Sequence, residues 1–210
     1  MKKGIVFDLD GVIVSTDEFH FKAWKKMADE EGVPFDSSIN SRLRGVSRMD
    51  SLLIILEKSN LNYSQAEKEE MCARKNAYYC EYLKELTPSF LSDEVRDTLI
   101  KLREKNIKLA IGSSSKNTKR ILNQIGLGDF FGSVADGTMI MHSKPHPEVF
   151  LKAASMIGLD PKDCYVVEDA YSGIDAAKDG GFTAIGVGDA FNYKKTDIPL
   201  TSFSKILDLF

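Results

Sequence analysis

Two aspartates close the first apolar run of the chain and constrain its fold more than any other feature. The run Gly4 to Phe7 in GIVFDLDGVIV is long enough for a buried strand, and Asp8 and Asp10 follow it, with Gly11 directly behind them. Because side chains alternate along an extended chain that rises about 3.3 Å per residue, the two carboxylates lie on the same side. A functional or structural reason for Asp8 and Asp10 at the end of a buried strand has to be found in the rest of the sequence.

Apolar runs and amphipathic helical runs alternate from about Leu91 onward. The expected strands are IKLAIG, GSVAD, CYVVED and FTAIGVG, and the expected helices are SDEVRDTLIKLREKN, a short helix from Asn117, PEVFLKAASMIG and a helix from Ser172. Such alternation is typical of a parallel sheet covered by helices on both faces. The sequence therefore predicts an α/β fold, a Rossmann-like doubly wound parallel sheet that also includes the first strand.

Between the first strand and this alternating region the chain contains only helical signals. Ser15 with Glu18, and Ser64 with Glu67, have the spacing of a capping box. We therefore expect an inserted helical-bundle cap domain over residues 15–87, and a catalytic core domain over residues 1–14 and 88–210. The two chain crossings between these domains are natural hinges for a lid.

Composition excludes several classes of function. A net charge of -3 gives no basic field for nucleic acid, and three cysteines without CxxC spacing fit reduced thiols in a cytosol. No apolar stretch approaches the roughly 20 residues of a membrane span, and Asp8 and Asp10 interrupt the run that could begin a signal peptide. We expect a cytoplasmic protein without membrane or nucleic-acid partners, and nothing demands more than a monomer.

Polar groups follow four strands at the carboxyl edge of the predicted sheet, where ligands bind in open parallel sheets. They are Asp8 with Asp10, the run Ser113, Ser114, Ser115, Lys116 and Asn117, then Lys144, and finally Glu168 with Asp169. Each alone could be a helix cap or a surface charge. Together, four carboxylates repel one another unless a cation such as Mg²⁺ compensates, and a lysine with hydroxyls and helix-terminal N–H groups suits a phosphoryl group.

This combination allows a specific chemistry. A carboxylate beside Mg²⁺ and a phosphoryl-binding site can act as a nucleophile and form an aspartyl phosphate. A second carboxylate two residues further on can act as general acid and base. The paired aspartates after the first strand are explained by these two roles.

Four motifs of the chain, FDLDGVI, SSSKN, SKPHPEVF and VVED, resemble those of the haloacid dehalogenase superfamily of aspartate-nucleophile phosphotransferases. The stretches DEFHFKAWKKMADEEG, LRGVSRMDSL and ARKNAYY further resemble the cap of its sugar-phosphate mutases. The resemblance extends along nearly the whole chain. It implies a small-molecule sugar-phosphate substrate and interconversion of β-D-glucose 1-phosphate and glucose 6-phosphate. An aspartyl-phosphate enzyme and glucose 1,6-bisphosphate, as intermediate and activator, would carry the phosphoryl group.

The resemblance also implies roles for residues of the core. Asp8 would be the nucleophile and Asp10 the acid and base, and Mg²⁺ would be held by Asp8, the backbone carbonyl of Asp10, Glu168 and Asp169. The transferring phosphoryl group would be held by Ser113, Ser114 and Lys144, and the other phosphate of the sugar by Ser115, Lys116, Asn117 and Arg48. Independently, SRLRGVSR offers Arg42, Arg44 and Arg48 with no acid among them, as a second anion site requires.

Positions in the cap complete the expected substrate-binding set. His20 and Lys75 match positions that hydrogen-bond near the acid and base, and Thr16 matches a hinge position. Trp24 and Gly45 belong to the same set. Arg44 stands where a lysine is expected and Ala170 where a serine is expected, and both departures concern sugar specificity rather than the chemistry.

Other functions stay open on the sequence alone. The nearest is a Mg²⁺-dependent sugar-phosphate phosphatase on the same fold, in which water accepts the phosphoryl group. A phosphonate hydrolase would need a Schiff-base lysine, for which Lys75 is the only matched candidate. A non-enzymatic phospho-receiver module would share the aspartate, Mg²⁺ and lysine but leaves the helical insertion unexplained. A dinucleotide-binding protein is disfavoured because no GxGxxG follows the first strand.

Overall fold

The computed structural model describes residues 2–43 and 46–210 and divides into two compact units. The first, here called the sheet unit, comprises residues 1–15 and 87–210. The second, here called the helical unit, comprises residues 16–86.

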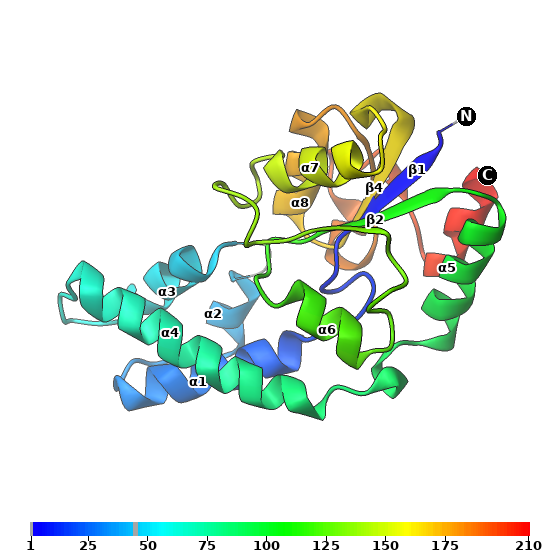
Figure 1. Cartoon of the computed structure of the whole chain (residues 1–210). Coiled ribbons are helices and arrows are strands. Elements are labelled where there is room, and N and C mark those ends of the chain that lie inside the picture. Colours follow the sequence, from blue (N-terminus) through cyan, green and yellow to red (C-terminus); the bar gives the residue numbers. More distant parts are fainter. Residues whose placement is uncertain (1, 44–45) are drawn as a thin grey trace. The chain divides into compact units, whose positions relative to one another are not determined.

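The sheet unit is built on six parallel strands in the order β3-β2-β1-β4-β5-β6. Figure 1 labels three neighbouring strands of this sheet, β2, β1 and β4. The strands are β1 (Gly4–Phe7), β2 (Lys108–Gly112), β3 (Ser133–Ala135), β4 (Cys164–Glu168), β5 (Thr183–Gly186) and β6 (Ile198–Pro199). Phe7, the last residue of β1, pairs with Ile111 of β2 and Val167 of β4. The strand order reverses at β1, so the residues after β1 lie where such sheets bind ligands.

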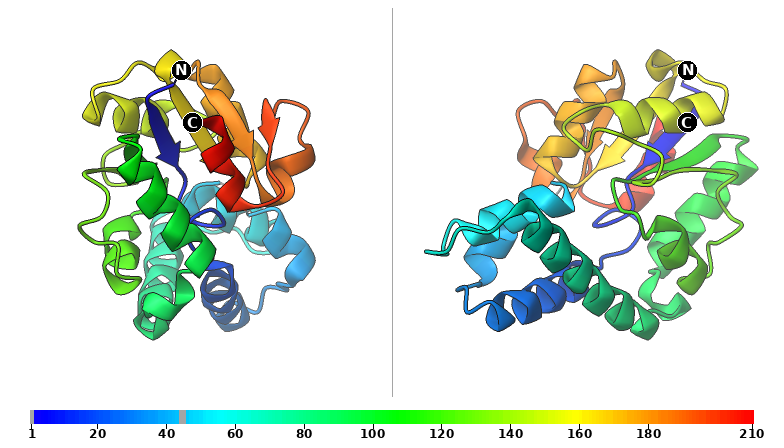
Figure 2. Two further views of the ribbon diagram at one scale, coloured as in Figure 1. Left: turned by 90° about the vertical axis from the view of Figure 1, so that its right-hand side faces the viewer. Right: turned by 60° about the vertical axis from the view of Figure 1, so that its left-hand side comes forward.

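Helices cover both faces of this sheet, which confirms the predicted doubly wound α/β fold. They are α5 (Asp93–Glu104), α6 (Thr118–Gln124), α7 (Glu148–Met156) and α8 (Tyr171–Asp179), with 3₁₀ helices η2 (Pro88–Phe90), η3 (Pro161–Asp163), η4 (Gly188–Asn192) and η5 (Phe203–Leu209). Val6 packs in one core cluster with Phe150 of α7 and Ile174 of α8. Phe7 points the other way and stacks on Phe203 of η5, with ring centroids 5.6 Å apart. Figure 2 shows η5 beside α5 on that second face.

The helical unit consists of α1 (Asp17–Glu30), α2 (Ser37–Ser41), α3 (Arg48–Leu56), α4 (Gln65–Tyr82) and the 3₁₀ helix η1 (Leu83–Glu85). Helices α1 and α4 lie side by side (Figure 1). The core of the helical unit contains Trp24, Met27, Leu52 and Ile55, all at most 2% exposed. No helix of residues 2–43 and 46–210 has both the length and the hydropathy to cross a bilayer.

One of the two predicted capping boxes is wrong. Ser64 and Glu67 form theirs at the start of α4, as predicted. The N-cap of α1 is Thr16 rather than Ser15, and in the described part of the chain the Thr16 side chain makes no capping hydrogen bond. Glu18, the expected partner of Ser15, instead pairs with Lys22 one turn later, at 2.7 Å. The Thr16 hydroxyl lies 2.7 Å from the hydroxyl of Tyr79.

Candidate active site

A buried lysine joins two carboxylates at the carboxyl end of the sheet. The Lys144 ammonium donates one hydrogen bond to Asp8 Oδ1 and another, of 2.6 Å, to Glu168 Oε1. All three residues are buried, at 7% exposure or less. Parallel pairing brings the acids together, because Asp8 follows β1 and Glu168 ends the neighbouring β4, and the Asp8 N–H donates to the Val167 carbonyl at 3.0 Å.

Burial controls the electrostatics of this cluster. Burial raises the pKa of Asp8 to about 7. The positive charge of Lys144 partly opposes this shift, and the negative charge of Glu168 adds to it. Burial by itself would lower the pKa of Lys144, but the charges and hydrogen bonds of Asp8 and Glu168 raise it above its ordinary value. Lys144 therefore stays a cation at neutral pH, beside a carboxyl group whose protonation changes near neutral pH.

Two glycines make room for Glu168 and Asp169 at the end of β4. Gly11 has φ +79°, and a Cβ placed there would lie 2.1 Å from Asp169 Oδ2, so the Asp169 carboxylate packs against the turn that contains Asp10. A Cβ on Gly173 would lie 1.9 Å from Glu168 Oε1. The other Glu168 oxygen accepts the Ala170 N–H at 2.8 Å. The fold therefore brings Asp8, Glu168 and Asp169 to one edge of the sheet, with Asp169 against the turn that carries Asp10.

The charge balance differs from the sequence-based expectation, which assigned the compensation of the carboxylates to Mg²⁺. In the structure, Lys144 neutralises part of the charge on Asp8 and Glu168. Within residues 2–43 and 46–210, no three acidic, imidazole or thiol side chains already converge as a metal-ligand group. The donors near the turn are all oxygens, the ligand type that Mg²⁺ prefers.

Hydroxyl groups follow β2 at the same edge of the sheet. The Ser113 hydroxyl is buried and accepts the Ser115 N–H at 3.2 Å, and the Ser115 hydroxyl accepts the Asn117 N–H at 3.2 Å. Lys116 is exposed. The Ser114 Oγ is buried and has no hydrogen-bond partner within residues 2–43 and 46–210. Because buried polar atoms are nearly always paired, this hydroxyl suits a ligand oxygen.

The helical unit has a polar cluster of its own. The ammonium of Lys75, which is 2% exposed, lies 2.8 Å from His20 Nδ1 and over the rings of Trp24 and Tyr79, at 4.8 and 4.7 Å from their centroids. The fold therefore brings the predicted residues His20, Trp24 and Lys75 together.

The imidazole of His20 is held neutral in this cluster. Burial, followed by the charges of Lys75 and Arg48, holds the pKa of His20 well below its usual value of 6.5. In a neutral imidazole, Nδ1 can accept a hydrogen bond from the Lys75 ammonium. His20 therefore acts as a hydrogen-bonding group at neutral pH rather than as a cation.

Tyr79 belongs to this cluster, although the sequence analysis did not single it out. Its ring stacks on that of His20, with centroids 4.1 Å apart, and its hydroxyl contacts Thr16. The signal was present in ARKNAYY, because Tyr79 lies one helical turn after Lys75 on the same face of α4. Without the position of α1, this spacing equally fits an ordinary core residue.

Of the arginines in SRLRGVSR, Arg48 is held differently from Arg42. Arg42 makes a two-pronged ion pair with Glu57, with both contacts at 2.8 Å. Arg48 is half-buried and donates to the neutral amide oxygen of Asn76 at 2.8 Å, and burial lowers its pKa. Its positive charge is therefore not neutralised by a carboxylate of the described residues. Arg44 and Gly45 lie outside the described residues.

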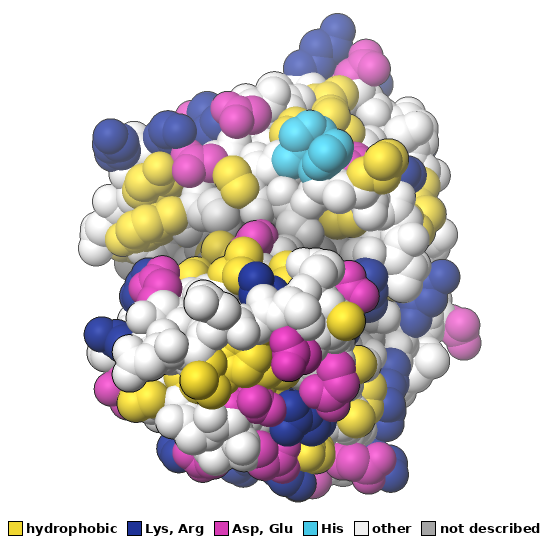
Figure 3. Space-filling view, turned by 90° about the vertical axis from the view of Figure 1, so that its left-hand side faces the viewer, with side chains coloured by type: hydrophobic (Ala, Val, Ile, Leu, Met, Phe, Trp, Pro, Cys, Tyr) yellow, Lys and Arg dark blue, Asp and Glu magenta, His cyan; other side chains and the backbone are white. Residues whose placement is uncertain are grey.

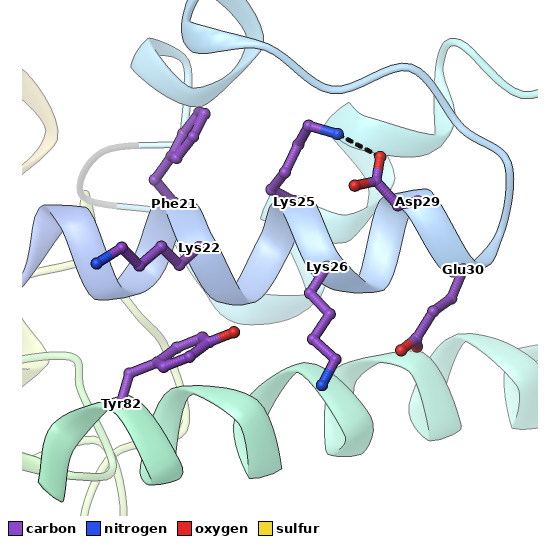
Figure 4. A pocket seen from close by; sticks show the side chains of 7 residues that line it. All are labelled: Phe21, Lys22, Lys25, Lys26, Asp29, Glu30 and Tyr82. Atoms are coloured by element: carbon purple, nitrogen blue, oxygen red, sulfur yellow. Dashed lines mark hydrogen bonds and ion pairs between the residues drawn. The ribbon is translucent and has the colours of Figure 1, made fainter.

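A groove of about 450 Å³ on the helical unit contains none of the predicted site residues. Figure 4 shows its lining from α1 and α4, which is Phe21, Lys22, Lys25, Lys26, Asp29, Glu30 and Tyr82. Its three lysines already have partners: Lys25 pairs with Asp29, Lys22 pairs with Glu18, and the Lys26 ammonium lies over the ring of Tyr78. We therefore do not assign this groove to the substrate.

The face of the molecule in Figure 3 carries mixed charge. On the face in Figure 3, basic and acidic side chains are interspersed, and histidine side chains gather at one place. The exposed histidines of the chain are His142 and His146, whose ring centroids are 4.8 Å apart. The described residues on that face form no extended basic surface.

Comparison with known proteins identifies the relatives of this chain. Residues 2–181 match the model of the haloacid dehalogenase-like hydrolase family, which confirms the resemblance drawn from the motifs. The chain is 42% identical to the β-phosphoglucomutase of Bacillus subtilis (strain 168), over 89% of this chain and 83% of that protein. It is 30% identical to the fructose-1-phosphate phosphatase YqaB of Escherichia coli (strain K12), over 88% and 95%. A crystal structure of β-phosphoglucomutase from Clostridium difficile matches with a TM-score of 0.91 and 38% identity, over 98% of this chain and 93% of that one.

Proposed function

We propose that this chain, which belongs to the haloacid dehalogenase-like hydrolase family, is an isomerase that interconverts β-D-glucose 1-phosphate and glucose 6-phosphate. Two relatives named β-phosphoglucomutase, at 42% and 38% identity, support this activity over that of the phosphatase relative at 30%. The observation that carries the proposal is the buried Lys144 ammonium, bonded to both Asp8 and Glu168. A phospho-receiver module finds no support among these relatives.

In this proposal the sheet unit is the catalytic core, and Asp8 carries the phosphoryl group. In the first step the C6 hydroxyl of β-D-glucose 1-phosphate attacks the phosphorus on Asp8, the bond from phosphorus to Asp8 breaks, and Asp10 takes the hydroxyl proton. The product is glucose 1,6-bisphosphate. In the second step Asp8 attacks the phosphorus at C1, the bond to the sugar oxygen breaks, and Asp10 returns the proton to that oxygen.

Four groups would hold Mg²⁺, namely the carboxylates of Asp8, Glu168 and Asp169 and the backbone carbonyl of Asp10. The fit is supported by their uniform oxygen chemistry and by the position of Asp169 against the turn at Gly11. When bound, Mg²⁺ would supply positive charge to the phosphoryl oxygens and favour the ionised form of Asp8.

Lys144 and the serines after β2 would bind the transferring phosphoryl group. Lys144 would donate to a phosphoryl oxygen, and the unpartnered hydroxyl of Ser114 would gain an acceptor. Ser113 completes this set. We assign the second phosphate to Ser115, Lys116, Asn117 and Arg48, because a bisphosphate needs two anion sites and the Arg48 charge faces only a neutral amide among its described partners.

The helical unit would act as the cap that recognises the sugar phosphate, through Thr16, His20, Trp24 and Lys75, together with Arg44 and Gly45. Because Nδ1 of the neutral His20 accepts from Lys75, the Nε2–H of His20 and the remaining N–H groups of the Lys75 ammonium are donors for hydroxyl or phosphate oxygens. These groups would hold the sugar phosphate with C6 towards Asp8 in the first step and with C1 towards Asp8 in the second.

A coupled assay tests the function. The protein is given Mg²⁺, β-D-glucose 1-phosphate and a trace of glucose 1,6-bisphosphate, and glucose 6-phosphate and free phosphate are followed in the same tube. Glucose 6-phosphate that greatly exceeds free phosphate supports the mutase. Free phosphate without glucose 6-phosphate would support the phosphatase, the second candidate, to which the 30% identical relative points.

A further inference from the structure

We infer that Tyr79 is a positioning residue for the sugar-phosphate reaction, because it fixes the side chains of Thr16, His20 and Lys75. This inference rests on the proposed function. It adds to the site a residue that would act through its neighbours rather than by touching the reacting atoms.

The contacts of Tyr79 single it out within the helical unit. Its hydroxyl lies 2.7 Å from Thr16 Oγ1, its ring stacks on His20 at 4.1 Å with an interplanar angle of 28°, and the Lys75 ammonium lies 4.7 Å from its ring centroid. Tyr79 is 1% exposed. One rigid ring therefore sets the positions of three proposed substrate-binding side chains.

The start of α1 shows that the Thr16 hydroxyl is diverted from its usual use. Threonine at an N-cap commonly accepts a hydrogen bond from the first turn, and losing such a cap costs stability. Thr16 occupies the N-cap of α1 but makes no side-chain cap bond. Its hydroxyl contacts Tyr79 instead. A local rule broken without a local gain is expected at functional sites.

Thr16 is also the first residue of the helical unit. It is 1% exposed, so its side chain is fixed where the chain passes from one compact unit to the other. The Tyr79 hydroxyl, reaching it from α4, ties this first residue to the cluster of His20 and Lys75. Weakening that tie should disturb the handling of the sugar and leave the phosphorylation of Asp8 unaffected.

The test uses Tyr79→Phe, which removes the hydroxyl and keeps the ring. Tyr78→Phe is the matched control, because it removes a neighbouring hydroxyl of α4 that bonds Glu30 at 2.7 Å, outside the cluster. Two rates are measured in the full-length protein: turnover of β-D-glucose 1-phosphate, and phosphorylation of Asp8 by acetyl phosphate, a donor without a sugar. We expect Tyr79→Phe to lower kcat/KM for the sugar roughly tenfold and to change phosphorylation less than about twofold.

A double-mutant cycle with Thr16→Val identifies the bond responsible. If the Thr16–Tyr79 contact carries the effect, the double variant is no slower than the slower single variant. The inference would be overturned if the two substitutions multiplied their effects on kcat/KM, or if Tyr79→Phe had the same kcat/KM as Tyr78→Phe. In either case, mutase turnover by the wild-type protein would still uphold the proposed function. Absence of mutase turnover in the wild-type protein would overturn the proposed function and this inference with it.

Discussion

The Lys144 ammonium lies 2.6 Å from Glu168 Oε1, and it donates its other observed hydrogen bond to Asp8. These three charged groups are buried together, so each depends on the others for compensation. Removal of the lysine should therefore show how strongly the site is coupled to folding.

Lys144→Met should lower the free energy of unfolding by about 3–5 kcal/mol at pH 8, because it leaves two buried carboxylates without a cation. The loss should shrink at pH 5, because Asp8, whose pKa burial raises to about 7, can take up a proton there. Urea unfolding at both pH values measures it. Lys178→Met removes an ion pair of 2.6 Å with Asp197 that is about one-third exposed, and should cost at most about 1 kcal/mol. An equal loss for Lys144→Met at both pH values would contradict the coupling.

His20 should make stability depend on pH. Since its pKa in the folded protein lies below the unfolded value of 6.5, the unfolded chain takes up the proton first as pH falls. The contribution of His20 to stability is therefore complete above pH 6.5 and decreases below it. His20→Asn should flatten the slope of unfolding free energy against pH between about 7 and 5. His142→Asn, at an exposed position, should retain the wild-type slope, and a wild-type slope in His20→Asn would refute the assignment.

Activity should require Mg²⁺ and disappear on chelation. Asp169→Asn should raise the Mg²⁺ concentration needed for half-maximal activity by at least roughly tenfold, because it removes a charged oxygen donor. Mg²⁺ should also raise the unfolding temperature of the wild-type protein and raise that of the variant less. Asp160→Asn alters an exposed carboxylate and is the control. A Mg²⁺ response unchanged by Asp169→Asn would remove this residue from the metal site.

Arg48 should contribute to binding of the second phosphate. Arg48→Lys keeps the charge but loses the planar fork, so KM for glucose 1,6-bisphosphate should rise roughly tenfold. Phosphorylation of Asp8 by acetyl phosphate should change little. Arg42→Lys, which alters an arginine paired with Glu57, is the control. An unchanged KM in Arg48→Lys would place the second phosphate elsewhere.

Local patterns in the sequence carry most of the fold. The strands and longer helices follow from apolar runs and amphipathic spacing. The helix α2 (Ser37–Ser41) and the strand β6 (Ile198–Pro199) were not predicted, because each is very short. β6 exists through its pairing with β5. Such tertiary contacts leave little trace in local sequence.

The site shows the same limit. The residues of the four strand ends could be proposed from position and motif, but the link from Lys144 to both Asp8 and Glu168 joins segments up to 136 positions apart. The wrong capping box at Ser15 has a similar origin, since Glu18 pairs with Lys22 and α1 begins after Thr16. Side-chain partners of this kind are chosen by the packed structure.

The most direct test of the account is the fate of a phosphoryl group on Asp8. The protein is loaded from glucose 1,6-bisphosphate with Mg²⁺, the adduct is located by mass spectrometry, and β-D-glucose 1-phosphate is then added. We predict one phosphoryl group on Asp8, absent in Asp8→Asn, that passes to the sugar faster than to water. Loading at another residue, or release of the phosphoryl group as free phosphate in the presence of the sugar, would contradict the account.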